Sequence, residues 1–526
     1  MAALSTADHS VSPPAIRIPR DYNAAHDLLE RNLVAGRAGK IAFIDDAGRY
    51  TFGELAERVN RFGSGLLNLG VGMEERVMLV LVDGIDFPTA FLGAIKAGII
   101  PVAVNTLLTP TDYAHMLADS RARALVVSAH LLPMFEPLIG KMPFLRHVVV
   151  SGRAAKGSIG IAEMLASGSP ALDPAPTTSD DPCCWFYSSG STGAPKGAVH
   201  VHSSMVITAE LYGKAVLGVA EEDVLFSAAK LSFAYGLGNA LTFTLAAGAT
   251  GVLMAERATP AAVFKRLVGS KPSIFYGVPT LYASMLARPD FPGKGDLALR
   301  ACVSAGEPLP AELGRRWKEK TGIDILEGIG TTEMLHMYIS ARHGDVRYGA
   351  TGIPVPGYEL RLVDEEGRAV KRGELGELQV RGPTSAAFYW NNRDKSRSTF
   401  VGPWFTSGDK FREDDDGYFV YAGRADDMLK VSGLFVSPAE VEAALVSHDA
   451  VLEAAVVGRA DDNQLIKPKA FVVLKERASA SDALRLELQQ HIKDRLAPYK
   501  YPRWIEFIPE LPKTATGKIQ RFKLRA

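Results

Sequence analysis

The 526-residue sequence is poor in cysteine, and its charges cancel. The three cysteines, Cys183, Cys184 and Cys302, have neither metal-ligand spacing nor the pattern of a disulfide framework. Lys and Arg together number 59, as do Asp and Glu, so the formal net charge is zero. A neutral chain has no overall field that would attract nucleic acid or an anionic membrane. We therefore expect inert core thiols and only local binding of charged ligands.

Long apolar runs are also missing. The longest, such as residues 77–82, have the length of a strand and are far too short to span a membrane. Residues 1–21 are polar and lack the cationic flank and apolar core of a signal peptide. We therefore expect a cytoplasmic protein with no membrane or nucleic-acid partner. Its hydrophobic content of 47% is sufficient for large cores in more than one domain.

Strand-like and helix-like segments alternate through much of the chain. Residues 77–82, a helical segment at 87–96 and residues 99–104 form a β-α-β pattern, and Thr51 and Glu54 have the spacing of a helix capping box. Further strands are expected at residues 124–127, 251–254, 273–276 and 300–303. This order predicts an α/β fold with mostly parallel, helix-covered sheets.

The pattern changes twice towards the C-terminus. Between residues 351 and 420, turn dipeptides separate short alternating strands, which predicts a β-rich subdomain. Farther on, Ser437, Pro438 and Glu440 have the order of an N-cap, a first-turn proline and a capping glutamate, and a compact α+β pattern follows. We divide the chain into a large N-terminal domain, residues 1–425, and a small C-terminal domain, residues 426–526.

Residues 187–197 combine hydroxyls, glycines and one lysine directly after the apolar run 183–186. Glycines let the backbone approach an oxyanion, N–H groups and hydroxyls donate hydrogen bonds, and Lys196 supplies a charge. The segment is not the common nucleotide P-loop, because Lys196 follows Pro195 and not a glycine. A flexible Ser/Gly linker is the alternative, but apolar segments flank this stretch on both sides. We predict a polyphosphate-binding loop formed by Ser188, Ser189, Gly190, Ser191, Thr192, Gly193 and Lys196.

This stretch, YSSGSTGAPKG, resembles the phosphate-binding signature of the acyl-adenylate-forming superfamily, which includes acyl-CoA synthetases, luciferases and the adenylation domains of peptide synthetases. Two Thr-to-Ser exchanges separate it from the family pattern YTSGTTGxPKG. Companion motifs follow in the family's order, so the resemblance covers roughly residues 40 to 526. It implies a large N-terminal domain and a small, mobile C-terminal domain.

A second motif places a hydroxyl beside a carboxylate after a glycine-flanked turn. Thr332 is suited to donate to a phosphate and Glu333 to bind Mg²⁺ through oxygen, although the pattern alone also fits a helix N-cap. It resembles the family's Y-G-x-T-E segment, except that Ile329 stands where a tyrosine usually stacks against adenine. The resemblance implies that two segments contact the nucleotide. Their residues are Gly328, Ile329, Gly330 and Thr331 in this motif, and Ala305, Gly306, Glu307 and Pro308 in a loop that resembles the family's adenine-side loop.

The remaining family motifs imply a ribose site, a hinge and a catalytic lysine. Asp409 and Arg424 match the two family residues that reach the ribose, although a Ser-Gly-Asp sequence alone also fits an ordinary turn. Asp426 matches the hinge about which the C-terminal domain rotates. Lys518 matches the family's catalytic lysine. Without the resemblance, a lysine so near the C-terminus would be interpreted as a solvent-exposed residue of a mobile tail. Gly433 resembles the glycine that lines the pantetheine tunnel.

Together these motifs imply that an acid is adenylated and then transferred to a thiol. A carboxylate is a poor electrophile, so it first attacks the α-phosphorus of ATP, while Lys518, Lys196 and Mg²⁺ near Glu333 neutralise charge. No carrier-protein segment follows the small domain, so free coenzyme A is the expected acceptor. The expected cofactors are ATP, Mg²⁺ and coenzyme A. Two points stay open: whether a protein acetyltransferase acts on Lys518, and the oligomeric state, for which a homodimer is one option.

Two segments, residues 231–240 and 334–337, are expected to wall a short acid pocket. Their sequences, together with residues 327–330, most resemble those of bacterial benzoate-CoA ligases. Phe233 corresponds to a gate residue in relatives, and Lys430 is a candidate partner for the aryl carboxylate. Core packing and a plain surface lysine are the respective alternatives. The expected pocket residues are Phe233, Ala234, Tyr235, Gly236, Leu335, His336 and Lys430.

The predicted activity is therefore ATP-dependent ligation of benzoate, or a close aryl acid, to coenzyme A, releasing AMP and pyrophosphate. A ligase for a hydroxybenzoate or a short-chain fatty acid is an alternative. A non-catalytic nucleotide-binding homologue is another, although Lys518, Glu333 and Asp409 are retained. A luciferase-like oxygenase has no positive support in the sequence.

Overall fold

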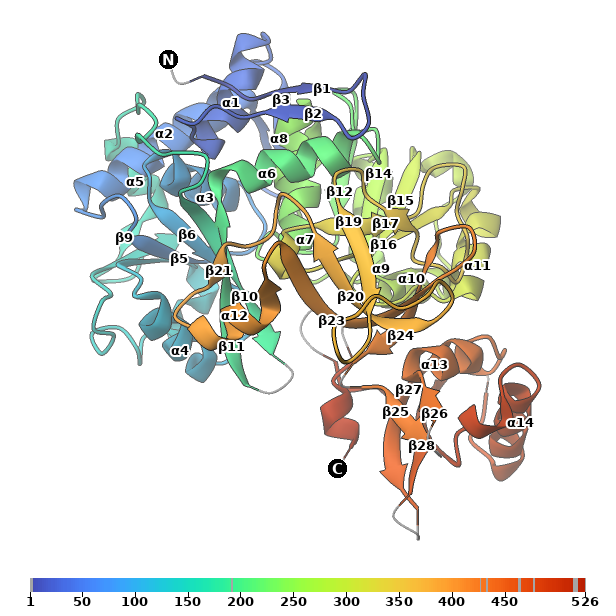
Figure 1. The fold of residues 1–526 in the computed structure, drawn as a ribbon. Coiled ribbons are helices and arrows are strands. Elements are labelled where there is room, and N and C mark those ends of the chain that lie inside the picture. Colours follow the sequence, from blue (N-terminus) through green and yellow to red (C-terminus); the bar gives the residue numbers. More distant parts are fainter. Residues whose placement is uncertain are drawn as a thin grey trace.

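Helices and mostly parallel sheets build the larger part of the molecule, and a smaller unit follows it in the chain (Figure 1). The computed structural model describes residues 3–190, 193–425, 427–431, 434–461, 465–475, 478–513 and 519–525. An antiparallel hairpin, β1 (Thr6–Asp8) and β2 (Ala15–Arg17), opens the chain. The predicted α/β fold is confirmed.

The first large sheet has the strand order β21-β11-β10-β6-β5-β7-β8-β9 in the described residues. The strands from β10 to β9 are parallel, whereas β11 and β21 add to one edge in antiparallel orientation. Its strands are β5 (Arg76–Val80), β6 (Ile100–Ala103), β7 (Ala124–Ser128), β8 (His147–Ser151), β9 (Ile159–Gly160), β10 (Pro182–Gly190), β11 (Gly193–Val201) and β21 (Phe388–Tyr389). The helices of this region are α2 (Phe52–Asn68), α3 (Asp86–Lys96), α4 (Pro110–Ser120), η1 (Ala129–Met134) and α5 (Ile161–Ser167). The predicted β-α-β unit is β5-α3-β6.

The second large sheet has the order β18-β17-β16-β15-β14-β12-β13-β3-β4, with parallel strands from β16 to β3. Its strands are β3 (Ile41–Ile44), β4 (Arg49–Thr51), β12 (Val224–Ser227), β13 (Thr250–Val252), β14 (Ile274–Gly277), β15 (Ala301–Ser304), β16 (Ile325–Gly330), β17 (Met337–Ser340) and β18 (Ile353–Pro354). Its helices are α1 (Ala24–Val34), α6 (His202–Thr208), η2 (Ala209–Lys214), α7 (Ala234–Leu237), η3 (Gly238–Thr242), α8 (Phe243–Ala247), α9 (Pro260–Gly269), α10 (Pro279–Leu286), η4 (Lys294–Asp296), α11 (Ala311–Thr321) and η5 (Thr332–Met334). All four strands predicted at residues 124–127, 251–254, 273–276 and 300–303 are present, as β7, β13, β14 and β15.

A smaller antiparallel sheet follows, as the turn-rich pattern after residue 351 predicts. It pairs β19 (Glu359–Val363), β20 (Leu375–Arg381), β23 (Trp404–Glu413) and β22 (Phe400–Val401), and β24 (Phe419–Arg424) pairs with β23. Helix α12 (Arg393–Thr399) precedes β22. Strand β21 comes from the same region of the chain but does not belong to this sheet. It pairs with β11 at the edge of the first large sheet.

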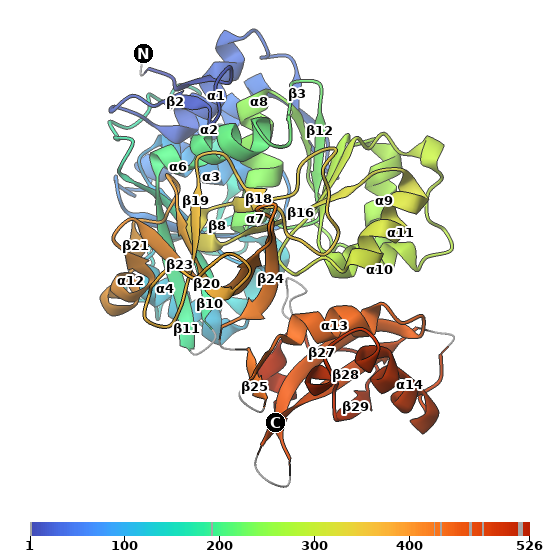
Figure 2. The same cartoon turned by 45° about the vertical axis from the view of Figure 1, so that its right-hand side comes forward.

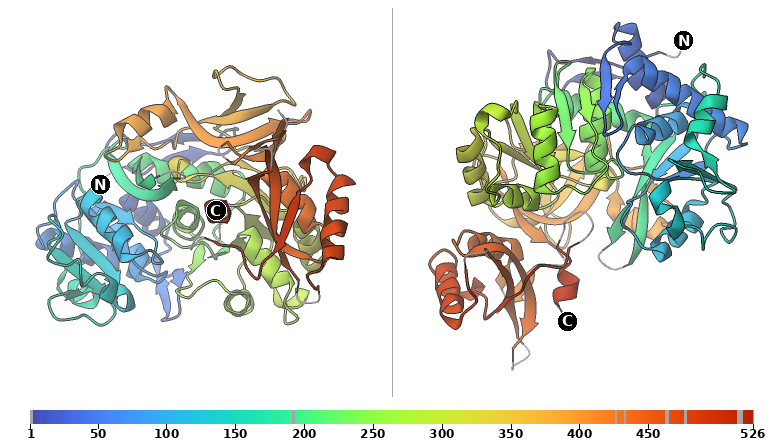
Figure 3. Two further views of the ribbon diagram at one scale, coloured as in Figure 1. Left: turned by 90° about the horizontal axis from the view of Figure 1, so that it is seen from below. Right: turned by 180° about the vertical axis from the view of Figure 1, so that it is seen from behind.

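The C-terminal residues form a separate small unit (Figures 2 and 3). Its strands are β25 (Leu429–Val431), β26 (Leu434–Val436), β27 (Val451–Ala460), β28 (Ile466–Leu474) and β29 (Trp504–Phe507), and its helices are α13 (Pro438–Val446), α14 (Asp482–Lys493), η6 (Pro498–Lys500) and η7 (Arg521–Leu524). A core that includes Val441, Val456 and Leu488 belongs to this unit alone. The domain boundary at Asp426 stays a prediction, because that residue lies outside the described ranges.

Local capping signals explain two helix starts. Thr51 and Glu54 form the predicted capping box, which fixes the start of α2. At α13 the Ser437 side chain accepts the Glu440 N–H, as expected for an N-cap. The Glu440 carboxylate, however, binds Lys500 Nζ at 2.6 Å, so the predicted capping role of this glutamate is wrong. A long-range ion pair takes the side chain away from its own helix terminus.

The segment predicted as a phosphate loop is mostly strand. Strands β10 and β11 form an antiparallel hairpin, in which Ser188 pairs with Lys196 and Gly190 with Gly193. This pairing satisfies backbone groups of the glycine-rich stretch and keeps it extended, and β21 pairs with β11 just beyond it, at Ala198 and Val199. The connecting residues 191–192 lie outside the described ranges.

The three cysteines are buried and free, as predicted. Burial raises the pKa of the Cys302 thiol to about 12 and that of Cys183 well above its usual range, so neither ionises readily. Among the described residues, no helix is both long and apolar enough to cross a membrane. The expected cytoplasmic location stays a prediction.

Candidate functional site

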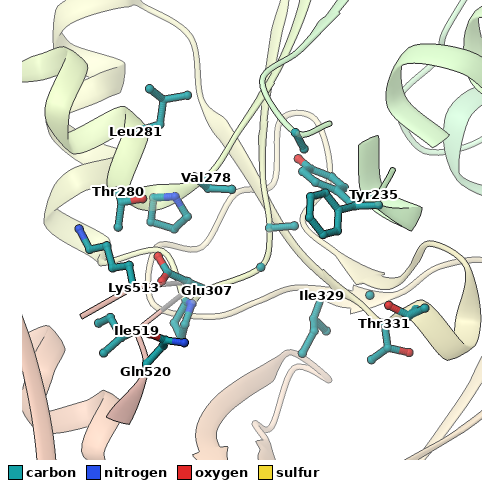
Figure 4. Close-up of a pocket in the computed structure, with 18 of the residues that line it drawn as sticks. Tyr235, Val278, Thr280, Leu281, Glu307, Ile329, Thr331, Lys513, Ile519 and Gln520 are labelled. Atoms are coloured by element: carbon teal, nitrogen blue, oxygen red, sulfur yellow. The ribbon is translucent and has the colours of Figure 1, made fainter. Parts of the chain in front are cut away.

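A cleft of about 3730 Å³ is lined by residues from both large sheets, the β-rich sheet and the C-terminal unit. Figure 4 shows part of it, with Tyr235, Ile329, Thr331 and Glu307 around the pocket. Most predicted site residues line this one cleft although they come from distant parts of the chain. They are Ser188, Lys196, Phe233, Ala234, Tyr235, Ala305, Gly306, Glu307, Pro308, Gly328, Ile329, Gly330, Thr331, Thr332, Glu333, Leu335, His336, Asp409 and Arg424.

Other predicted residues are placed differently. Gly236 does not line the cleft; it lies in α7, where an added Cβ would be 2.1 Å from the Lys230 carbonyl oxygen. The backbones of Ser189, Gly190, Gly193 and Lys430 lie on β10, β11 and β25, but the side chains of Ser189 and Lys430 are outside what the structure describes. The predictions for Ser191, Thr192, Asp426, Gly433 and Lys518 fall outside the described residues.

Glu333 is held in place from several directions at the turn between β16 and β17. It is buried, and its Oε1 accepts hydrogen bonds from Ser188 Oγ at 3.2 Å and from the Tyr389 hydroxyl at 2.7 Å. The ring of His200 contacts the neighbouring Thr332 carbonyl at 2.7 Å. Burial lowers the pKa of His200 to about 4, so the ring is neutral at pH 7. These contacts fix the carboxylate beside Ser188 of the β10–β11 hairpin.

The donor set around Glu333 fits Mg²⁺. No group of three or more His, Cys, Asp or Glu side chains that could hold a metal occurs in the described part of the chain. Mg²⁺ in nucleotide sites is commonly bound by one or two carboxylates, with phosphate oxygens and water completing the octahedron. In addition, the buried Thr331 hydroxyl makes no hydrogen bond to any described residue. It can therefore donate a hydrogen bond to a ligand in the cleft that Glu333 also lines. One carboxylate next to such a hydroxyl suits a metal-nucleotide site.

Lys196 faces the same place from β11. Its Nζ lies 4.9 Å from the centre of the Tyr389 ring. Burial lowers the pKa of Lys196, an effect that the nearby Glu333 charge opposes. A partly dehydrated cation of this kind interacts strongly with a phosphate.

Asp409 and Arg424 meet across paired strands β23 and β24. Arg424 Nη1 donates to Asp409 Oδ1 at 3.2 Å and to the Ser407 carbonyl oxygen at 3.1 Å. Gly408, which precedes Asp409 in β23, has φ of +73°, and a Cβ there would approach Arg424 Nη2 to 2.9 Å, so glycine is required. This part of the strand presents a buried carboxylate to the cleft, as a site for ribose hydroxyls needs.

The expected acid pocket ends in an aromatic cluster. The ring of His336 lies 4.7 Å from that of Phe243, 5.0 Å from Tyr212 and 5.7 Å from Tyr235. Burial lowers the pKa of His336 to about 3, so the imidazole is neutral at pH 7, and its Nε2 lies 3.1 Å from Asn239 Oδ1. This arrangement gives a dry, largely apolar wall.

Leu335, next to His336, has a left-handed backbone with φ of +63°. This conformation is strained for a leucine and is found mainly where neighbouring structure imposes it. It turns the chain sharply between η5 and β17, so that both Leu335 and His336 line the cleft.

The C-terminal tail is anchored on both sides of residues 514–518. Lys513 Nζ binds Glu453 at 2.6 Å, and Arg521 Nη2 binds Glu442 at 2.7 Å. Arg521 Nη1 also lies 3.7 Å from Asp427, the residue after the predicted hinge. Figure 4 shows Lys513, Ile519 and Gln520 on the side of the pocket that carries Glu307. The tail thus lies beside the predicted adenine-side loop.

The sequence interpretation missed several residues of the site. They are Tyr389, which lines the cleft, and His200, Tyr212 and Phe243, which contact the lining residues Thr332 and His336. The backbone N–H of Ala386 donates to the Glu333 carbonyl oxygen at 2.7 Å, which brings Tyr389 to the carboxylate. A short edge strand carries no periodic signal, so only the fold reveals this contact.

Two family comparisons agree with this geometry. Residues 29–390 match the AMP-binding enzyme family, and residues 440–518 match the AMP-binding enzyme C-terminal domain. The chain belongs to the AMP-binding enzyme family. The resemblance to the acyl-adenylate-forming superfamily is therefore confirmed.

Within this family, the chain is similar to enzymes of aromatic acids along its whole length. It is 63% identical to the benzoate-CoA ligase of Thauera aromatica, with 100% of both chains covered. It is 49% identical to the 4-hydroxybenzoate-CoA/benzoate-CoA ligase of Rhodopseudomonas palustris, over 96% of this chain and 94% of the relative. Among solved structures, a benzoate CoA ligase from Burkholderia xenovorans LB400 superposes with a TM-score of 0.91 at 53% identity, covering 96% of this chain and 100% of the other.

Proposed function

We propose that the protein joins benzoate to coenzyme A with ATP, through benzoyl-AMP, and releases AMP and pyrophosphate. The observation that carries the proposal is one cleft that holds Lys196, Glu333 and Asp409 together with an aromatic-walled pocket ending at His336. The named activity of the relative with 63% identity over both full lengths supports the same conclusion.

In the first half-reaction a benzoate oxygen attacks the α-phosphorus, and the bond to pyrophosphate breaks. Lys196 and the hydroxyls and N–H groups of the hairpin hold the β- and γ-phosphates, and Asp409 with Arg424 holds the ribose. Glu333 would hold Mg²⁺, which supplies neutralisation of phosphate charge. Lys518 reaches the acid oxygen and the α-phosphate, and Lys430 pairs with the aryl carboxylate; both roles rest on the family resemblance.

In the second half-reaction the thiol of coenzyme A attacks the acyl carbonyl and AMP leaves. We propose that residues 426–526 rotate about Asp426 between the two steps, and that Gly433 then lines the path of the pantetheine arm. Lys518 leaves the site with this rotation. Acetylation would remove its charge and stop only the first step.

Acid-dependent exchange of pyrophosphate into ATP, followed by coenzyme A thioester formation, tests the proposal. We expect benzoate to support both. Two further acids are tested beside benzoate. One is 4-hydroxybenzoate, which appears in the name of the Rhodopseudomonas palustris relative, and the other is butyrate, a short-chain fatty acid. Butyrate should be poor, because it is too small to fill a pocket lined by Tyr235 and His336. Exchange with no acid of this panel would overturn the proposed function.

A further inference from the structure

Two opposite charges share the phosphate end of the cleft without pairing. Lys196 and Glu333 both line it, and the Glu333 charge raises the pKa of Lys196 against the larger effect of burial. Nevertheless, in the described part of the chain, Lys196 Nζ and the Glu333 carboxylate oxygens are more than 4.0 Å apart, so the two side chains do not form an ion pair. Opposite charges in a partly buried site attract strongly, so something must hold them apart.

Tyr389 lies between the two charged groups. Its hydroxyl donates to Glu333 Oε1 at 2.7 Å, and its ring receives the Lys196 ammonium at 4.9 Å from the centroid. The phenol is buried, and its hydroxyl is the hydrogen-bond donor in the contact with the carboxylate. The Tyr389 side chain therefore donates a hydrogen bond to the carboxylate through its hydroxyl and makes a cation–π interaction with the ammonium through its ring.

The surrounding structure fixes this side chain. Tyr389 pairs with Ala198 at the sheet edge, its N–H donates to Ser396 Oγ at 2.9 Å, and its ring packs 5.3 Å from that of Phe400. The segment also binds the Glu333 backbone through Ala386. Tyr389 cannot follow either charge without breaking these contacts.

We propose that Tyr389 is a positioning residue that keeps Lys196 and Glu333 apart, so that the cation stays available to phosphate and the anion to the metal. This inference rests on the proposed function. Glu333 Oε1 is already occupied by two donors, whereas no described residue donates a hydrogen bond to Oε2. A direct ion pair would use both groups and leave neither for MgATP.

The test compares Tyr389→Phe with the intact enzyme. This change removes one hydroxyl and keeps the ring, so the fold should survive. Mn²⁺ with a non-hydrolysable ATP analogue, measured by isothermal titration, should bind about 10-fold more weakly, because a hydrogen bond to a charged acceptor is lost. The kcat/KM for MgATP in pyrophosphate exchange should fall similarly, while thioester formation from supplied benzoyl-AMP should stay unchanged.

Two further variants make the result specific. Tyr22→Phe removes an equally buried phenol that donates to a carboxylate, Asp27, at 2.6 Å, outside the cleft, and it should leave Mn²⁺-nucleotide binding unchanged. In a Glu333→Gln background, Tyr389→Phe should have much less effect, because the charged acceptor is gone.

The inference would be overturned if Tyr389→Phe bound the Mn²⁺-nucleotide as tightly as the intact enzyme does. It would also be overturned if the rates of pyrophosphate exchange and of thioester formation fell equally. If benzoate fails to support exchange in the intact enzyme, the proposed function is overturned instead, and nucleotide binding still decides the role of Tyr389.

Discussion

Glu327 is a buried carboxyl group whose protonation should be linked to stability. Burial raises its pKa from the ordinary 4.5 to about 8, although the Leu309 N–H donates to its Oε1 at 3.1 Å. Between these two pKa values the folded protein binds a proton that the unfolded chain has lost. Stability from this residue is therefore complete below pH 4.5 and is lost as the pH rises towards 8.

We predict that Glu327→Gln removes this pH dependence. The melting temperature of the intact protein should fall between pH 5 and pH 8 relative to that of the variant, by about 2 °C or more. Thermal unfolding of both proteins without ligands measures the difference. The exposed Glu365→Gln serves as the control and should follow the intact protein. Parallel curves for Glu327→Gln and the intact protein would contradict the linkage.

Ala234 tests the acid pocket at the same scale. This small residue at the start of α7 is buried and lines the cleft next to Tyr235. Ala234→Leu should overfill the pocket at a cost of about 1–3 kcal/mol and raise the KM for benzoate. The KM for ATP should not change. Steady-state kinetics with each substrate varied in turn would reject the pocket assignment if both constants moved together.

Single elements show where sequence reasoning succeeds and where it stops. The start of α2 could be predicted because Thr51 and Glu54 satisfy each other within one turn. The extended form of the phosphate segment could not, because its two arms pair with each other and β10 also pairs with the distant β6 only in the folded sheet. Likewise, Glu440 left its predicted capping role for Lys500, 60 residues away.

The tail anchors yield a prediction for an element. Arg521→Met should leave the largely buried Glu442 without its cation and leave Asp427 paired with Arg525 alone, so the anchor that follows residues 514–518 is weakened. We expect pyrophosphate exchange to fall about tenfold or more, because effective placement of a charged group is lost. Thioester formation from benzoyl-AMP should be spared. Arg485→Met removes an exposed cation of the same unit and should change neither rate; a similar loss in both variants would mean general damage to the C-terminal unit.

At the scale of the whole molecule, motif order and strand periodicity could predict mostly parallel, helix-covered sheets, a β-rich subdomain and a separate C-terminal unit. The resemblance could also name, one by one, many residues of the nucleotide and acid sites that line the cleft. Neither the patterns nor the resemblance could predict the contact of Tyr389 with Glu333, 56 residues apart, or the aromatic wall behind His336. Such contacts depend on how separate elements pack, and no local pattern encodes that.

The hinge gives the prediction for the whole molecule. Asp426→Pro should fix φ near −65° and hold the C-terminal unit in one orientation. We expect one half-reaction to survive and the other to fail by at least about tenfold. Measuring exchange and thioester formation on the same preparation checks this. Unchanged rates for both would place the hinge elsewhere.

The ion pair between Arg521 and Asp427 has a mechanical consequence. It ties the tail to the first residue beyond the proposed hinge. A small rotation of the backbone at the hinge would therefore move the tail together with the whole C-terminal unit over a large distance. A unit of this size moves against the drag of the surrounding water. Turnover limited by this swing should slow in proportion to solvent viscosity when sucrose is added, whereas a single pyrophosphate exchange step, which needs no swing, should not.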